Sequence, residues 1–222
     1  MSRSLPQWFL FDLDGTLLDS LPGIESSVRA AFTACRMPQL HTNLREMIGP
    51  PIRAILSRAG EIQDEKSLDC LEREFRADYD TQGWRKTVCF PHTGSVLRLM
   101  RERGYRLLAI SNKPRHISIR ILDNERILEL FEEIVTRDSR SPAYAGKEEM
   151  IGAIQAQRHI SSTNCLMVGD TIEDAKAAAS AGIRFAFMSH GYGTVDETSS
   201  VPVAWRLGSL SEFLPLLEIN ND

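Results

Sequence analysis

Short runs of apolar residues alternate with longer amphipathic stretches along most of the chain. The runs occupy residues 8–11, 105–110, 133–136, 165–168, 183–188 and 203–207. Most are apolar at every position instead of at every second one, which is typical of strands covered on both faces of a parallel sheet. The stretches between them have apolar residues at helical spacing. Strands that alternate with helices predict an open α/β sheet with right-handed crossovers.

Two of the helices have clear boundary signals. Thr93 is predicted to cap one helix at its start, and Gly104 to end it. The Ala-rich stretch 174–180 predicts another helix, and Gly182 lies just past its end.

Residues 21–86 break this alternation. They contain no apolar run that predicts a strand, and their apolar residues recur at helical spacing on both sides of a Gly-Pro-Pro turn at residues 49–51. Such a segment is too long for an ordinary loop. The predicted organisation is an α/β core domain made of residues 1–18 and 87–222, with a small all-helical domain, residues 19–86, inserted after the first strand.

Composition and charge exclude several classes of protein. The formal net charge of the 222 residues is −4, which gives no electrostatic reason to expect nucleic acid or an anionic membrane as a partner. No apolar run approaches the ~18 residues of a membrane-spanning helix. The first run has four residues, shorter than the ~7–15 of a secretory signal. We therefore expect a cytoplasmic protein.

The cysteines and histidines lack metal-binding spacing. The four cysteines, Cys35, Cys70, Cys89 and Cys165, are widely spread and form no C-x-x-C pair. A chain of this size can bury a sufficient core without disulfides, so they are predicted to be free thiols in a reducing cytosol. The five histidines are predicted to be structural or surface residues.

The most informative polar residues follow the first apolar run, in the sequence Phe-Asp-Leu-Asp-Gly-Thr at residues 11–16. Open α/β sheets bind ligands at the carboxyl ends of their strands, where this segment lies. In extended backbone, Asp12 and Asp14 point to the same side. Two carboxylates this close repel each other, so one must be protonated, paired or bound to a metal. Taken alone, the segment is equally consistent with a solvated turn.

A second acidic strand end follows residues 165–168, in the sequence Gly-Asp-Thr-Ile-Glu-Asp at residues 169–174. Alone, it is consistent with an ordinary turn that leads into a helix with an acid in its first turn. Together, the two strand ends would bring three or four carboxylates into one crevice, which a cation would stabilise. Oxygen ligands without His or Cys nearby favour Mg²⁺.

Two further segments are suited to binding an anion. Ser111 and Asn112 end another buried run, and a hydroxyl with backbone N–H groups at a helix start can hold an anion. Lys147 opens a predicted helix that ends near Gln157. Each has an ordinary alternative, a common turn for the first and a solvated lysine for the second.

Taken in order, these residues resemble the motifs of the haloacid dehalogenase-like hydrolase superfamily. That family carries D-x-D-G-T, a Ser or Thr after the second strand, a Lys, and G-D-x-x-x-D. The corresponding residues are Asp12-Leu13-Asp14-Gly15-Thr16, Ser111, Lys147 and Gly169-Asp170 with Asp174. The resemblance covers essentially the whole chain and implies a Rossmann-like α/β core with an α-helical cap. Asp19, Ser20 and the turn at residues 49–51 further resemble the phosphoglycolate phosphatase-like members.

The segment around the motif lysine departs from the family pattern. Relatives commonly surround this lysine with prolines, whereas residues 141–148 contain only Pro142. Lys147 is the only lysine between Pro114 and Asp170, which assigns it to the motif. Lys113 is the alternative.

The resemblance implies a Mg²⁺-dependent phosphatase that acts on a small-molecule phosphate monoester, with phosphoglycolate as the nearest example. Asp12 would attack phosphorus and form an aspartyl-phosphate. Asp14 would act as general acid and then as general base. The resemblance also implies three metal ligands, namely Asp12, the main-chain carbonyl of Asp14, and Asp170. It implies that Ser111, Asn112 and Lys147 bind the phosphate. Supporting roles fall to Gly15, Thr16 and Asp174.

Other functions share the same core residues. A sugar-phosphate mutase, an inorganic pyrophosphatase and a non-catalytic phospholigand-binding protein all remain open, whereas a dehalogenase has no use for an acid at Asp14. Residues 146–148 lack the spaced Gly of a P-loop, and residues 191–193 lack the third Gly of a dinucleotide motif. Oligomeric state is open.

The helical domain is expected to close over the crevice and exclude water, with hinges near residues 18–19 and 85–87. Arg45 and Arg53 flank the turn at residues 49–51, so either could bind a substrate carboxylate. Solvated helix arginines are the alternative interpretation.

Overall fold

The computed structural model describes residues 5–38, 43–195 and 201–218. Its centre is a six-stranded sheet in the order β5-β4-β1-β6-β7-β8, and every neighbouring pair is parallel. The strands are β1 (Trp8–Phe11), β4 (Arg106–Ser111), β5 (Glu133–Thr136), β6 (Cys165–Gly169), β7 (Arg184–Met188) and β8 (Trp205–Leu207). The predicted α/β class is confirmed, and each strand begins and ends within two residues of an apolar run.

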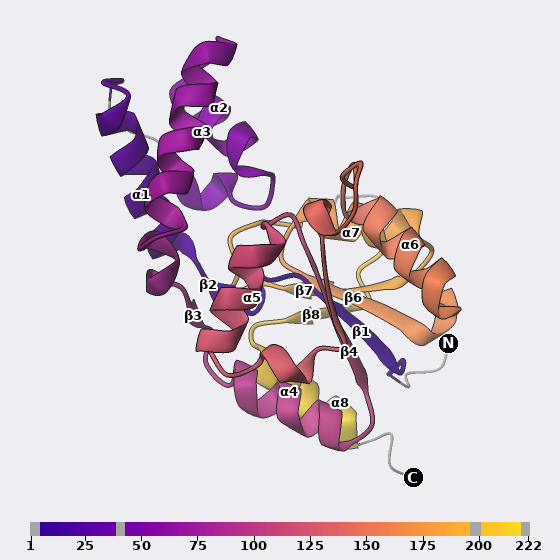
Figure 1. Cartoon of the computed structure of the whole chain (residues 1–222). Helices are drawn as coiled ribbons and strands as arrows, with labels where there is room; N and C mark the ends of the chain where they lie inside the picture. The colour runs from indigo at the N-terminus through magenta and orange to yellow at the C-terminus, as the bar shows by residue number, and fades with distance from the viewer. Residues whose placement is uncertain (1–4, 39–42, 196–200, 219–222) are drawn as a thin grey trace.

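Helices cover both faces of the sheet (Figure 1). Side chains alternate along β1, so Phe9 and Phe11 pack toward one layer and Trp8 and Leu10 toward the other. The first layer contains α4 (Thr93–Glu102), α5 (Arg115–Asn124) and α8 (Phe213–Glu218), and the second contains α6 (Lys147–Arg158) and α7 (Ile172–Ser180). Burial on both faces explains why these strands are apolar at every position.

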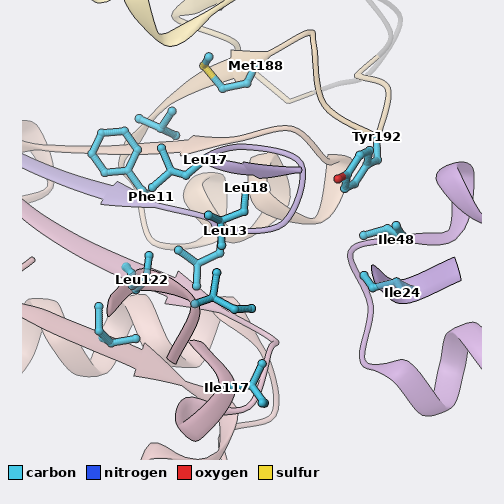
Figure 2. Close-up of a cluster of buried hydrophobic side chains, with 14 of the residues drawn as sticks. Phe11, Leu13, Leu17, Leu18, Ile24, Ile48, Ile117, Leu122, Met188 and Tyr192 are labelled. Carbon is cyan, nitrogen blue, oxygen red and sulfur yellow. The ribbon is translucent and has the colours of Figure 1, made fainter. Parts of the chain in front are cut away.

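Residues 21–79 contain a separate group of helices, which projects from one end of the sheet (Figure 1). The group consists of α1 (Leu21–Ala34), α2 (Ile52–Gly60) and α3 (Glu65–Tyr79), and α1 packs against α3. Its side chains continue into the core: Figure 2 shows Ile24 and Ile48 of this group beside Tyr192, which follows β7. We call residues 19–86 the helical insert.

Short elements complete the chain. The 3₁₀ turns are Leu44–Met47, Gly83–Lys86, Leu128–Leu130, Arg137–Ser139, Ser162–Asn164 and Leu210–Glu212. Strands β2 (Leu18–Asp19) and β3 (Val88–Cys89) pair antiparallel at the two ends of the helical insert. Two-residue strands leave no periodic signal in a sequence, so this pair was not predicted. It holds the two connections to the insert side by side, where hinges were expected.

Two sequence-based expectations are wrong. Cys35 and Cys70 form a disulfide between the end of α1 and the middle of α3, whereas Cys89 and Cys165 are free. The packing of α1 on α3 brings together cysteines that are 35 residues apart, and no spacing rule reports such a contact. The cap of α4 is His92, with φ +67°, so Thr93 is the first helical residue. No helix in the described ranges is long and apolar enough to cross a membrane.

Candidate active site

The predicted site residues meet at the carboxyl edge of the sheet. Asp12 follows β1, Ser111 ends β4, and Asp170 follows β6. Because β1 lies between β4 and β6, the carboxyl ends of these three strands are neighbours. All three side chains are buried. The sheet order thus assembles residues that are up to 158 positions apart.

Three carboxylates form a buried acidic cluster. One oxygen each from Asp12, Asp170 and Asp174 lies within 4.8 Å of the others. Burial raises the pKa of Asp12 well above its usual value; Lys147 opposes this, and Asp174 and Asp170 add to it. Burial and Asp174 likewise raise the pKa of Asp170 to about 6. The cluster holds only oxygen donors and gains from added positive charge, so it fits a hard divalent cation such as Mg²⁺.

Lys147 supplies part of that charge. Its Nζ lies 2.7 Å from Oδ1 of Asp12 and 2.6 Å from Oδ1 of Asp174. Burial lowers the pKa of Lys147, but Asp12 and Asp174 more than offset this and leave the pKa above its usual value. The other oxygen of Asp174 accepts hydrogen bonds from the backbone N–H and hydroxyl of Thr171 (3.1 and 2.6 Å). Thr171 and Asp174 together form the N-terminal cap of α7. Asp174 therefore orients Lys147 toward Asp12, despite the atypical residues before that lysine.

Asp170 is held by donors from two loops. Thr16 donates its hydroxyl to one oxygen (3.0 Å), and the backbone N–H groups of Tyr192 and Gly193 donate to the other (2.7 and 3.2 Å). Gly15 has φ +86°, and a Cβ there would lie 2.3 Å from Oδ2 of Asp170. Only glycine allows this close approach. Thr16 and Gly15 thus lie where supporting roles were predicted.

Tyr192 was missed by the sequence analysis. Its backbone N–H bonds to Asp170, while its hydroxyl accepts from the backbone N–H groups of Ser20 and Leu21 (2.7 and 3.0 Å) and donates to Asp19 (2.8 Å). Tyr192 therefore ties the acidic cluster to the first helix of the insert. The glycines on either side of Tyr192 were the only feature of the sequence that could have indicated a close approach of this loop to the site. A Cβ at Gly191 or Gly193 would come within 2.5 Å of Asp170.

Asp14 lies outside the carboxylate cluster. Both of its carboxylate oxygens are 3.0 Å from Nζ of Lys113. That ammonium group also lies 4.8 Å from the ring centre of Tyr79 in the helical insert. Burial lowers the pKa of Lys113, and Asp14 and Tyr79 more than offset this. Lys113 thus pairs with Asp14, whereas Lys147 pairs with Asp12.

The loop after β4 contacts the helical insert. The Ser111 hydroxyl accepts from the backbone N–H of Lys113 (3.2 Å), and Asn112 donates its side-chain amide to the carbonyl of Gly49 (3.0 Å). The turn at residues 49–51 therefore lies directly above the predicted phosphate-binding loop. The insert is in contact with the core across the site.

A small cavity of about 70 Å³ lies between the sheet edge and the insert. Asp12, Asp14, Ser111 and Lys113 line it on the core side, and helix α3 contributes Arg76. The rest of the wall is mainly apolar, with Ile24, Ile48, Gly49, Pro50, Pro51, Ile52, Ile55, Phe75, Tyr79, Asn112, Pro114 and Ile117.

Arg45 and Arg53, the two candidates for a substrate carboxylate, do not line this cavity. Arg45 donates to the carbonyls of His190 and Gly191 (3.1 and 2.6 Å), which links the insert to the core. Arg53 forms ion pairs with acidic residues of α3, namely Glu65, Asp69 and Glu72. Both guanidinium groups are engaged elsewhere, and the structure gives neither a contact with the cavity.

Known proteins match the chain over most of its length. The sequence model of the haloacid dehalogenase-like hydrolase family matches residues 9–188. The tyrosine-protein kinase PtkA of Mycobacterium tuberculosis is 32% identical over 217 residues, which cover 96% of this chain and 73% of that protein. The phosphoglycolate phosphatase of Cereibacter sphaeroides is 32% identical over 196 residues, which cover 82% and 85%.

Solved structures of related proteins share the fold of this chain over nearly its whole length. The crystal structure of a predicted phosphatase from Clostridium acetobutylicum has a TM-score of 0.84 at 25% identity and covers 97% of this chain and 100% of that one. The structure of PtkA from Mycobacterium tuberculosis has a TM-score of 0.80 at 30% identity and covers 96% and 98%. The family match over residues 9–188, together with a fold shared over nearly the whole length, shows that the chain is an enzyme of the haloacid dehalogenase-like hydrolase family that resembles its phosphoglycolate phosphatases.

Proposed function

We propose that this enzyme is a Mg²⁺-dependent phosphatase that hydrolyses a small phosphate monoester, such as phosphoglycolate, through an aspartyl-phosphate on Asp12. The observation that carries the proposal is the position of Asp12. It is buried, lies within 4.8 Å of the carboxylates of Asp170 and Asp174, and is paired with Lys147. Asp12 can stay ionised in this acidic cluster only if positive charge lies beside it. In the proposed reaction the same positive charge would stabilise the negative charge of the phosphoryl group in the transition state.

Asp12, the main-chain carbonyl of Asp14, and Asp170 would hold the metal. When bound, Mg²⁺ would offset the repulsion among the carboxylates and polarise a phosphoryl oxygen. Lys147 adds a fixed positive charge, and Asp174 keeps it aimed at Asp12.

In the first half of the proposed reaction, a carboxylate oxygen of Asp12 attacks phosphorus and the bond to the leaving oxygen breaks. Asp14 gives its proton to that oxygen. In the second half, Asp14 takes a proton from water, which attacks the phosphorus of the aspartyl-phosphate and restores Asp12. Asp12 and Asp14 both line the cavity, which supports their joint part in these steps.

Ser111, the Asn112 backbone amide and Lys147 would hold the phosphoryl oxygens. Ser111 and Lys147 are both buried, so they would bind the phosphate where water does not screen them. We propose that the helical insert, residues 19–86, is a cap domain that closes over this site. Two contacts support this, from Asn112 to Gly49 and from Arg45 to the loop after β7. The paired strands β2 and β3 would be its hinge.

The space around the site bears on the alternatives. The cavity beside Asp12 holds about 70 Å³, and a second cavity of about 660 Å³, which is lined by Lys147, meets it at Pro51 and Asn112. The first cavity favours a small ester, whereas a hexose phosphate or a nucleotide would have to extend into the second. Inorganic pyrophosphate is small enough to stay a candidate. A purely binding role has less support, because Asp14 has no evident use in it.

The test is phosphate release by the purified protein with Mg²⁺, measured for phosphoglycolate, pyrophosphate, sugar phosphates and nucleoside monophosphates. We expect turnover of the small esters and none with Asp12→Asn. The control Asp123→Asn changes an exposed carboxylate on α5 and should behave as the wild type. Transfer of phosphate to a sugar, with none released to water, would show a mutase instead.

A further inference from the structure

The cavity beside Asp12 has two walls of different character. The core wall carries the acidic groups Asp12 and Asp14, whereas the wall from the helical insert is apolar except for Arg76. Phe75, Arg76 and Tyr79 lie on one face of α3 at helical spacing, and all three line the cavity. Among the described residues of the insert, Arg76 is the charged side chain that lines this cavity.

The two cations that line the cavity differ in how well they are paired. Lys113 is held by both oxygens of Asp14 at 3.0 Å, and its side chain is 5% exposed. Arg76 has one ion-pair partner among the described residues, Glu72, at 3.5 Å. Glu72 is shared with Arg53, which is 3.2 Å away. Arg76 is therefore the more weakly paired of the two cavity cations, and its side chain is 33% exposed, so it is the better placed to bind another anion.

We propose that Arg76 binds a carboxylate on the leaving group of the substrate, and that the enzyme thereby selects phosphate esters of small hydroxy acids. The inference rests on the proposed phosphatase function. In the proposed reaction the phosphate would bind at the core wall beside Asp12, so a leaving group that extends toward α3 would bring its anionic end to Arg76. The planar guanidinium fork matches a carboxylate with two parallel hydrogen bonds.

Cavity size favours a carboxylate over a larger anion. The cavity holds only about 70 Å³ and is lined by Asp12 and Asp14 of the core and by Arg76 of the insert, so a leaving group that reaches Arg76 within it must be short. An uncharged leaving group would contact the apolar part of the wall but would gain no ion pair with Arg76.

The experiment compares two esters of equal chain length, 2-phosphoglycolate and ethyl phosphate, which lacks the carboxylate. Wild-type enzyme should prefer phosphoglycolate in kcat/KM. Arg76→Met keeps the apolar stem and should lower kcat/KM for phosphoglycolate by ~10–100-fold, mainly through KM, while ethyl phosphate changes less than ~3-fold. Arg76→Lys should recover part of the loss, because it keeps the charge without the fork.

The matched control is Arg73→Met on the same helix. Arg73 has a 68% exposed side chain, pairs with Glu74 and does not line the cavity, so both esters should behave as with the wild type. An equal loss on both esters with Arg76→Met, or a wild type that turns both over equally well, would overturn the proposal. A preference for an ester with a second phosphate in place of the carboxylate would overturn it too.

A binding measurement separates this proposal from the proposed function. The Asp12→Asn protein, titrated with 2-phosphoglycolate in a calorimeter, should bind it at least ~10-fold more tightly than Asp12→Asn/Arg76→Met does. If the wild type releases phosphate from no ester, the phosphatase proposal fails, and this titration still reports whether Arg76 binds the carboxylate. Equal affinity of the two proteins would contradict the role of Arg76.

Discussion

The sheet edge and the wall of the helical insert face each other across one cavity, but they are built differently. At the sheet edge, buried charges are paired: Lys147 lies between Asp12 and Asp174, and Asp170 accepts three hydrogen bonds. The insert contributes apolar side chains and the loosely paired Arg76. From this difference we predict that reaction and selectivity are separated. Changes at the sheet edge should affect every substrate alike, whereas changes in the insert should affect some substrates only.

The largest expected effect is at Asp12. Asp12→Asn should lower kcat by at least ~10⁴-fold on every ester, because it removes the attacking oxygen. Circular dichroism should show an unchanged fold, since the amide has nearly the same shape. Substantial turnover by this variant would show that the sheet edge does not carry the reaction.

Metal removal should come next. EDTA should stop turnover of every ester, and Mg²⁺ should restore it. Because Mg²⁺ would relieve the repulsion among Asp12, Asp170 and Asp174, it should also raise the free energy of unfolding, by ~2.7 kcal/mol at 100 times its Kd. In the Asp170→Asn variant, the same stabilisation should require a higher Mg²⁺ concentration. Thermal unfolding that is identical with and without Mg²⁺ would contradict a metal site in the acidic cluster.

Asp14 should show a dependence on the leaving group. Asp14→Asn should lower kcat by ~10²–10⁴-fold on alkyl phosphates, whose leaving oxygen needs a proton. The loss should be much smaller on p-nitrophenyl phosphate, whose leaving group departs without one. Equal losses on the two substrates would remove Asp14 as the general acid.

Lys113 should follow Asp14 with a smaller effect. Lys113→Met removes the ammonium that holds both Asp14 oxygens, so we expect a loss of ~10–100-fold on alkyl phosphates and less on p-nitrophenyl phosphate. The double variant Asp14→Asn/Lys113→Met should be little less active than Asp14→Asn alone. Lys66→Met, at an exposed position of α3, is the control. Full additivity of the two losses would mean that Lys113 acts independently of Asp14.

The smallest effect on activity is expected at the disulfide of the insert. Cys35→Ser/Cys70→Ser should lower the free energy of unfolding by ~3 kcal/mol while kcat/KM stays nearly unchanged, because neither cysteine lines the cavity. Alkylation without reductant, followed by mass spectrometry, should leave both cysteines unmodified in the wild type. Alkylation of both in protein quenched directly from cells would favour the reducing, cytoplasmic location that the sequence predicts.

The residues of the sheet edge could be predicted because they lie in short motifs at strand ends. Parallel strands bring their carboxyl ends to one edge, so finding the strands placed Asp12, Ser111 and Asp170 at the same edge. That they are neighbours follows from the strand order, which the structure supplies. Lys147 was assigned by elimination, since no other lysine lies in that part of the sequence.

The insert could not be predicted to the same depth, because its contacts depend on how helices pack. Arg45 and Arg53 stood out by flanking a Gly-Pro-Pro turn, whereas Arg76 looks like any polar residue beside an apolar helix face. The Cys35–Cys70 pair likewise required the α1–α3 packing. Helix periodicity tells which residues share a face, but not which face lines a cavity.

The central claim is that Asp12 carries the phosphoryl group during turnover. The direct measurement is rapid acid quenching of enzyme mixed with 2-phosphoglycolate and Mg²⁺, followed by mass spectrometry of the peptide that contains residues 9–14. We predict a transient gain of one phosphoryl group on Asp12, which appears before free phosphate and is absent in Asp12→Asn. Steady turnover with no phosphorylated Asp12 at any quench time, or with the group on another residue, would contradict the mechanism.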